Sequence, residues 1–251
     1  PDGKMALSGS WDKTCILWNL KKGRPQKILK GHTGYVLAVA ITPDGKMAFS
    51  GSYDKTCVLW NLENGMPLKT LKGHTSQVDA VAITPDGKMA LSGANDRTCI
   101  LWDLEIGKPH KTLKGHNSSV VAVAITPDGK MALSGSHDKT CIHWELERSI
   151  PPRKTLKAHT YHDVFDVAIT PNGKMAISGS STAFILWDLE SGRPLKTLRE
   201  NLGYVKTMVI TPDGTMALLG TYNYKRVLWD LDSGQLHKTI KGNNKGVVHA
   251  L

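Results

Sequence analysis

The stretch that decides the fold runs from residue 31 to residue 62 and reads GHTGYVLAVAITPDGKMAFSGSYDKTCVLWNL. It contains three short runs rich in Val, Ile, Thr and Ala, separated by Pro43-Asp44-Gly45 and Asp54-Lys55. Runs of this length between Gly, Pro and Asp predict β-strands. We expect strands over residues 36–42, 47–50 and 57–62, and a fourth over residues 68–72 after Asn64-Gly65.

The same pattern recurs along the chain with a nearly constant period. Pro-Asp-Gly, or Pro-Asn-Gly in one copy, begins at Pro1, Pro43, Pro85, Pro127, Pro171 and Pro212, so the spacing is 41 to 44 residues. Repeats of this period are either helical or built from four strands, and the short β-type runs exclude helices. We therefore expect one four-stranded antiparallel sheet per repeat.

A single four-stranded sheet cannot bury its apolar faces, so neighbouring sheets must stack as the blades of a β-propeller. Small residues on the first strand of a repeat fit the crowded inner end of a blade; they are Ala38, Ala40, Ala80, Ala82, Ala122 and Ala124. The predicted fold is all-β, a β-propeller of six four-stranded antiparallel blades forming one domain over residues 1–251.

Gly31-His32, Asp54 and Trp60-Asn61 together resemble the WD40-repeat family, with Trp-Asp itself at Trp102, Trp187 and Trp229. The style of the units is similar to WD40 arrays of bacterial multidomain signalling proteins. The resemblance implies a buried His-Ser-Asp-Trp tetrad in each repeat. Three repeats carry complete sets: His32, Ser50, Asp54, Trp60; His74, Ser92, Asp96, Trp102; and His116, Ser134, Asp138, Trp144.

The other repeats depart from this set. The first keeps Ser8, Asp12 and Trp18, with Asn243 in the place of its His. The fifth keeps His159, Ser178 and Trp187 but has Ser181-Thr182 where Asp is expected. The sixth keeps only Trp229, beside Asn201, Leu219 and Asn223.

Enzyme signals are weak. A hydrolase triad needs an exposed nucleophile on a strained turn, and no Gly-x-Ser-x-Gly occurs. No phosphate-binding loop occurs either, since Gly-Lys is never followed by Ser or Thr. The histidines show no metal-binding spacing, and Cys15, Cys57, Cys99 and Cys141 recur every 42 residues as small buried hydrophobes. We expect no catalysis, no cofactor and no metal, and a reducing, cytoplasmic location.

The net charge of +10 raises the possibility of nucleic acid. The lysines recur evenly, after five of the six Pro-Asp-Gly or Pro-Asn-Gly turns and twice in each Lys-x-Leu-Lys segment, for example Lys69 and Lys72. We interpret them as a solvated surface and keep nucleic acid, or another acidic ligand, as the alternative partner. No apolar run approaches the ~18 residues that span a bilayer, so no membrane role is expected.

Protein or peptide partners are favoured by positions that vary while the rest of the repeat stays constant. They lie just before the tight-turn Asp and at the start of the first strand, and aromatic side chains there suit interface hot spots. The predicted binding residues are Trp11, Tyr35, Leu37, Tyr53, Gln77, Asn95, His137, Phe165, Tyr204 and Tyr222.

The chain opens on Pro-Asp-Gly and ends in mid-pattern, so we expect a fragment of a longer protein. Aligning Gly242 with Gly31 places Leu251 opposite Ala40, which lets residues 247–251 supply a first strand for the blade that opens the chain. A closed six-bladed ring and an arc of a seven-bladed or larger parent both remain open.

Hydrogen exchange checks closure. If the ring closes, the amides of residues 247–251 pair beside residues 5–8 and exchange slowly, because buried backbone groups need partners. Rapid exchange throughout that tail would favour the open arc.

Overall fold

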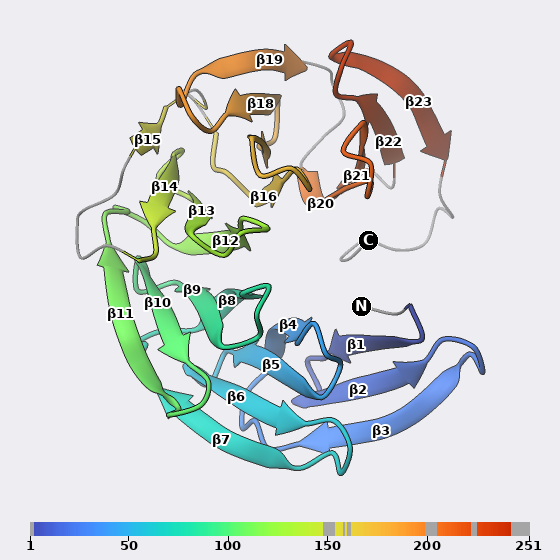
Figure 1. Cartoon of the computed structure of the whole chain (residues 1–251), viewed down its shortest axis with the longest axis vertical. Helices are drawn as coiled ribbons and strands as arrows, with labels where there is room; N and C mark the ends of the chain where they lie inside the picture. Colours follow the sequence, from blue (N-terminus) through green and yellow to red (C-terminus); the bar gives the residue numbers. More distant parts are fainter. Residues whose placement is uncertain are drawn as a thin grey trace. The chain divides into compact units, whose positions relative to one another are not determined.

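The computed structural model describes residues 3–147, 154–157, 159, 162–198, 205–221 and 225–241 (Figure 1). The chain divides into two compact units, Pro1–Val120 and Val121–Leu251, which are described one at a time. The residues expected to close a ring, 247–251, and the binding residues Tyr204 and Tyr222 lie outside the described part of the chain.

The first unit contains three antiparallel sheets. They are β1 (Met5–Gly9), β2 (Thr14–Asn19) and β3 (Arg24–Lys30); β4 (Val36–Ile41), β5 (Met47–Ser52), β6 (Thr56–Asn61) and β7 (Pro67–Lys72); and β8 (Val78–Ile83), β9 (Met89–Ala94), β10 (Thr98–Asp103) and β11 (Lys108–Lys114). Consecutive strands pair in each sheet, as a meander requires.

Three four-stranded sheets follow in the second part of the chain. They are β12 (Val120–Ile125), β13 (Met131–Ser136), β14 (Cys141–Glu145) and β15 (Lys154–Leu156); β16 (Asp166–Ile169), β17 (Met175–Gly179), β18 (Phe184–Asp188) and β19 (Pro194–Leu198); and β20 (Val205–Ile210), β21 (Met216–Thr221), β22 (Lys225–Asp230) and β23 (Gln235–Lys241). The predicted all-β class is confirmed, and six consecutive antiparallel sheets are the blades of a β-propeller.

The turn between the first two strands of a sheet follows the predicted chemistry. Gly45 has a φ of 71°, and the Asp44 carboxylate accepts hydrogen bonds from the Lys46 amide at 3.0 Å and the Thr42 hydroxyl at 2.6 Å. The Thr42 hydroxyl also accepts from the Met47 amide at 3.0 Å. This threonine, which recurs as Thr84, Thr126, Thr170 and Thr211, was missed in the sequence although it directly precedes five of the six Pro-Asp-Gly or Pro-Asn-Gly turns.

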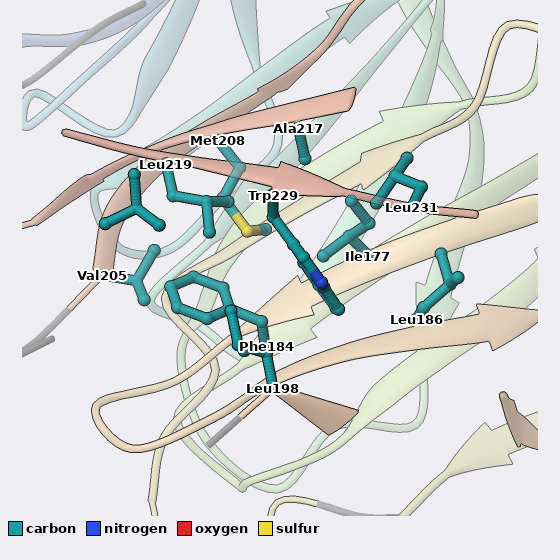
Figure 2. Packing of buried hydrophobic residues seen from close by; sticks show 11 residues of the cluster. Ile177, Phe184, Leu186, Leu198, Val205, Met208, Ala217, Leu219, Trp229 and Leu231 are labelled. Atoms are coloured by element: carbon teal, nitrogen blue, oxygen red, sulfur yellow. The ribbon is translucent and has the colours of Figure 1, made fainter. Parts of the chain in front are cut away.

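Within each unit, the Trp of one sheet packs against the sheet before it, as Trp60, Trp102, Trp187 and Trp229 do. In the first unit, Trp102 and Leu104 of the third sheet pack on Phe49, Leu59 and Leu71 of the second. In the second unit, Trp229 packs in the same way among side chains from β17 to β22 (Figure 2). Burial of these large apolar side chains is the main stabilising term between neighbouring sheets.

The four cysteines are buried and free, as predicted, and the contacts of Cys15 and Cys141 with a serine were missed in the sequence analysis. The thiol of Cys15 pairs with Ser50 of the next sheet, and Cys141 pairs with Ser178 in the same way. Burial raises the pKa of Cys15 to about 12, so this thiol stays protonated.

In the last two sheets, the serine position and the cysteine position that faces it are both occupied by other residues. Leu219 stands at the register position of the serine, and Phe184, at the register position of the cysteine, packs on Trp229 with ring centroids 6.1 Å apart. A thiol donor without a serine acceptor would be a buried polar group without a partner, which explains why an apolar pair replaces a polar pair.

The interpretation of the lysines as solvated surface is wrong for Lys69, Lys154 and Lys196. The ammonium of Lys69 donates to the carbonyl oxygens of Leu104, at 3.4 Å, and Glu105 in the next sheet. Lys154 reaches Glu190, and Lys196 reaches Leu231 and Asp232, in the equivalent turns of their own neighbours. These lysines bridge adjacent blades.

Replacing Lys69 with Met tests this bridge, because Met keeps most of the apolar stem and removes the donor. We expect a loss of about 1–2 kcal/mol in the free energy of unfolding by urea titration. Lys72→Met, at the exposed end of the same strand, should change it by less than ~0.5 kcal/mol. Equal effects at the two positions would contradict the bridge.

Candidate partner-binding surface

The tight turns that carry the predicted binding residues rest on a buried hydrogen-bond network. In the second sheet, His32 places Nδ1 2.9 Å from Asp54 Oδ2 and Nε2 2.7 Å from Ser50 Oγ, and Trp60 Nε1 donates to the same Oγ at 2.8 Å. The third sheet repeats these contacts with His74, Asp96, Ser92 and Trp102.

Asp54 ties two loops together. Its carboxylate accepts the Thr33 amide at 2.8 Å from the loop before β4, and the Thr56 amide at 3.0 Å and hydroxyl at 2.6 Å from the tight turn. Burial opposes ionisation of Asp54, but these bonds and His32 outweigh it and lower its pKa to about 2. Burial lowers the pKa of His32, because it disfavours the charged imidazolium. At pH 7 Asp54 is therefore a carboxylate and His32 a neutral imidazole.

The remaining repeats keep parts of this network. Trp144 Nε1 donates to Ser134 Oγ at 2.7 Å, and Asp138 accepts the Thr140 amide and hydroxyl; His116, the fourth member of that set, is buried at the end of the first unit. In the first sheet Trp18 donates to Ser8 at 2.8 Å, while Asp12 accepts from Thr14 within its own turn.

The fifth and sixth repeats show the cost of their departures. His159 reaches Ser178 at 2.6 Å, but its Nδ1 and the Ser181 hydroxyl are buried without a partner among the described residues, because the turn lacks its Asp. Trp229 Nε1 is likewise unpaired within the described chain, since Leu219 replaces its serine acceptor. Asn201, Asn223 and Asn243 lie outside the described residues.

This geometry does not resemble a hydrolytic site. Ser50 and Ser92 are fully buried, and each hydroxyl already accepts an indole N–H. A nucleophile must be reachable by substrate, so the network stabilises loops instead. Within the described residues, no three His, Cys, Asp or Glu side chains are placed to hold a metal ion.

Asp96→Ala tests the network. It leaves the imidazole of His74 and the amides of Thr75 and Thr98 without their acceptor, so we expect a loss of about 1–3 kcal/mol in the free energy of unfolding. Ser181→Ala, in the incomplete turn, should change it by less than ~0.5 kcal/mol. Urea titrations of the two variants compare them, and equal losses would refute the contrast.

His159 should make stability fall in mild acid. Burial, assisted by neighbouring His162, lowers the pKa of His159 to about 4, whereas an unfolded histidine titrates near 6.5. Below pH 6.5 the unfolded chain therefore binds a proton that the folded chain refuses, and stability drops until about pH 4.

We expect this loss to reach about 3 kcal/mol between pH 6.5 and pH 4, from the shift between the two pKa values. His159→Asn removes the titration, so its unfolding free energy should fall less steeply with pH than that of the unchanged protein. His110→Asn, at an exposed position, should keep the original slope. Identical slopes for all three proteins would disprove the assignment.

Above the network, the first unit exposes three aromatic side chains that contact one another, the aromatic cluster Trp11, Tyr35 and Tyr53. They are 71%, 43% and 56% exposed. Trp11 stacks on Tyr35 with ring centroids 5.5 Å apart and planes inclined by 18°, and Tyr35 meets Tyr53 at 5.8 Å. Sequence analysis named all three, but only the structure joins them.

Backbone bonds fix this cluster. The Tyr53 amide donates to the Tyr35 carbonyl at 2.9 Å, and the Val36 amide donates to the Ser10 carbonyl of the neighbouring sheet at 3.0 Å. Leu37 stands at a β-bulge in the pairing of β4 with β5, a distortion that redirects a side chain. The periodicity of the sequence gave no sign of this bulge.

The other predicted residues make smaller polar and aromatic contacts. Asn95 lies beside Gln77, whose carbonyl accepts the Asn95 amide at 3.0 Å, and Asn95 also accepts from the Ser119 hydroxyl at 2.8 Å. In the second unit, His137 meets Phe165 edge to face at 5.8 Å. The structure thus brings together one cluster in the first unit and one pair in the second.

Cations beside these residues were missed. Lys13, Lys55 and Arg97, and Lys139 in the second unit, follow the tight-turn Asp at positive φ and are exposed. Each of them directly follows the tight-turn Asp, so the repeated Asp-Lys or Asp-Arg dipeptide in the sequence could have revealed them.

Comparison with known proteins agrees with the fold. The family model described as WD domain, G-beta repeat, matches residues 1–19, 23–61, 65–103, 107–145 and 150–188. A stretch of 43 residues, 17% of the chain, is 44% identical to part of the small ribosomal subunit protein RACK1y of Oryza sativa subsp. japonica. The match spans only 13% of the rice protein.

No helix long and apolar enough to cross a membrane occurs in the described residues. The five repeat matches cover most of the chain, and the described strands and hydrogen bonds follow the same repeat. The chain belongs to the WD40-repeat family.

Proposed function

We propose that this chain is a non-catalytic WD40 scaffold or sensor module that binds protein or peptide partners. The binding surface is formed by the loops before the first strands and the turns between the second and third strands. The observation that carries the proposal is the aromatic cluster, three exposed rings held by backbone bonds above a buried network.

Exposed aromatic side chains in contact are unusual on a surface that has no partner. Each ring offers a large apolar area and has few rotatable bonds, so little conformational entropy is lost on binding. Their mutual contacts reduce this loss further, since the rings are ordered before the partner arrives. This combination suits the centre of a protein interface.

The relatives support the same class of function. Five repeats match the WD40 family model, and the rice protein that shares a stretch of 43 residues is named as a small ribosomal subunit protein. The absence of an exposed nucleophile in the tetrads favours a binding role over catalysis. We further propose that residues 1–251 act as one domain, without a cofactor, in the reducing environment of the cytoplasm that suits four free thiols.

Nucleic acid remains the second candidate, because the chain carries a net charge of +10. Phosphate binding would lose affinity steeply with rising salt, whereas aromatic contacts would not. The aromatic cluster favours a protein or peptide partner over nucleic acid.

The test replaces Trp11, Tyr35 and Tyr53 with Ala and measures binding of peptides selected on the unchanged chain from a displayed random library. Truncating one such residue typically costs ~2 kcal/mol or more, about thirty-fold in affinity, so the triple variant should lose detectable binding. The melting temperature should change little, because the tetrads lie beneath the exposed rings.

The control replaces Lys46, Lys88 and Lys130, in the turns after the first strands, with Ala. Peptide binding should be nearly unchanged in this variant. Retained binding in the aromatic variant, together with loss in the lysine variant, would reject the proposed surface.

A further inference from the structure

The tight turns of the first unit place a cation at a strained backbone position. Lys13, Lys55 and Arg97 have φ values of 73°, 70° and 70°. Each closes its turn through its amide, which donates to the carbonyl of Ser10, Ser52 or Ala94 at 3.1 to 3.2 Å. Residues other than glycine are uncommon there because the Cβ atom crowds the backbone.

At the other positions of positive φ the chain carries glycine. Apart from these turns and the equivalent Lys139, every described residue with positive φ is Gly. Glycine or asparagine at the tight turns would remove the strain, yet each turn carries Lys or Arg. The long cationic side chain is therefore retained for something other than the fold of the turn.

These cations are exposed and not engaged inside the molecule. None of the three pairs with a carboxylate among the described residues, where the resolved ion pairs join His32 to Asp54 and His74 to Asp96. The carboxylates in the same turns are already occupied by Thr hydroxyls and amides. In the second and third sheets the turn carboxylates, Asp54 and Asp96, are largely buried while Lys55 and Arg97 are exposed. In the first sheet both Asp12 and Lys13 are exposed.

Lys13 and Lys55 are close in sequence to members of the aromatic cluster, and Arg97 occupies the equivalent position in the next turn. Lys13 follows Trp11 by two residues, Lys55 follows Tyr53 by two, and Arg97 follows Asn95 by two. In the turns after the first strands, by contrast, Lys46 and Lys88 are each next but one to an exposed Asp that interacts with them electrostatically. Aromatic rings and exposed cations are thus combined on one surface of the first unit.

We propose that this surface binds an acidic peptide segment, in which Asp or Glu side chains flank at least one aromatic or aliphatic residue. The apolar residue contacts Trp11, Tyr35 and Tyr53, and the flanking carboxylates pair with Lys13, Lys55 and Arg97. The three rings cover a path of roughly three or four residues of extended chain. The proposal rests on the proposed function and adds the chemistry of the partner.

A peptide fits better than single-stranded nucleic acid. Bases bind such surfaces by stacking on a free aromatic face. Tyr35 already contacts both Trp11 and Tyr53, so its ring is largely used within the cluster. Aliphatic and aromatic side chains of a peptide need only the exposed edges and the outer face of Trp11.

The experiment selects peptides from a displayed random library on the full chain and measures the Kd of the best binder. The test variant carries Lys13→Asn, Lys55→Asn and Arg97→Asn; asparagine tolerates positive φ, so the turns should fold. The matched control carries Lys22→Asn, Lys46→Asn and Lys88→Asn. It also removes three positive charges, but from exposed turns elsewhere in the first unit. Circular dichroism checks both variants.

Selected peptides should be richer in Asp and Glu than the library and contain an aromatic or aliphatic residue. The test variant should weaken binding about tenfold and the control less than about twofold, as expected for three exposed charge pairs. Raising NaCl from about 0.05 to about 0.5 M should bring the Kd of the unchanged chain closer to the Kd of the test variant, because salt screens the charge pairs.

Neutral peptides that need the aromatic cluster but bind the test variant unchanged would overturn the acidic partner and leave the proposed function standing. Binding that survives loss of the aromatic cluster, or a library that yields no binder, would overturn both. A single-stranded oligonucleotide that displaces the selected peptides and binds more tightly would reassign the surface to nucleic acid.

Discussion

The serine hydroxyl in the second strand of each complete sheet is the interaction on which the rest depends. Ser50 Oγ accepts the indole N–H of Trp60, contacts His32 Nε2 from the preceding loop, and pairs with the Cys15 thiol of the neighbouring sheet. One buried oxygen thus connects a strand, a loop and the preceding blade. Since leaving such a group unsatisfied costs about 1–3 kcal/mol, the three elements are fixed relative to one another.

The consequence for function is that the turn tips are free to vary. His32 and Asp54 hold the loop before β4 and the tight turn through side chains and amides that do not involve the exposed residue at position 53. Residues above the network therefore change without loss of the fold, and the aromatic cluster occupies such positions. Rigid support beneath a varied surface is what a binding module requires, because preorganised side chains lose less entropy on association.

The incomplete repeats show what happens when members of this network are lost. Loss of the serine at Leu219 is accompanied by Phe184 in place of the cysteine, which replaces a polar contact by packing on Trp229 (Figure 2). Loss of the turn Asp leaves His159 with an unpaired Nδ1 among the described residues and a strongly lowered pKa. The aromatic cluster lies instead in the first unit, where His32 and His74 have complete networks.

The sequence alone determined the repeat, the strand order and the Pro-Asp-Gly turns, because each depends on residue types at fixed local spacing. Its resemblance to the WD40-repeat family implied the members of the tetrads. Only the tertiary structure decided what depends on distance between repeats. The contact of Trp11 with Tyr35, the bridge from Lys69 to the next blade, the Cys15–Ser50 pair and the bulge at Leu37 join or redirect residues from different strands. Periodicity assigns a residue to a strand, but packing and twist between neighbouring sheets decide which side chains meet, and those contacts make the surface.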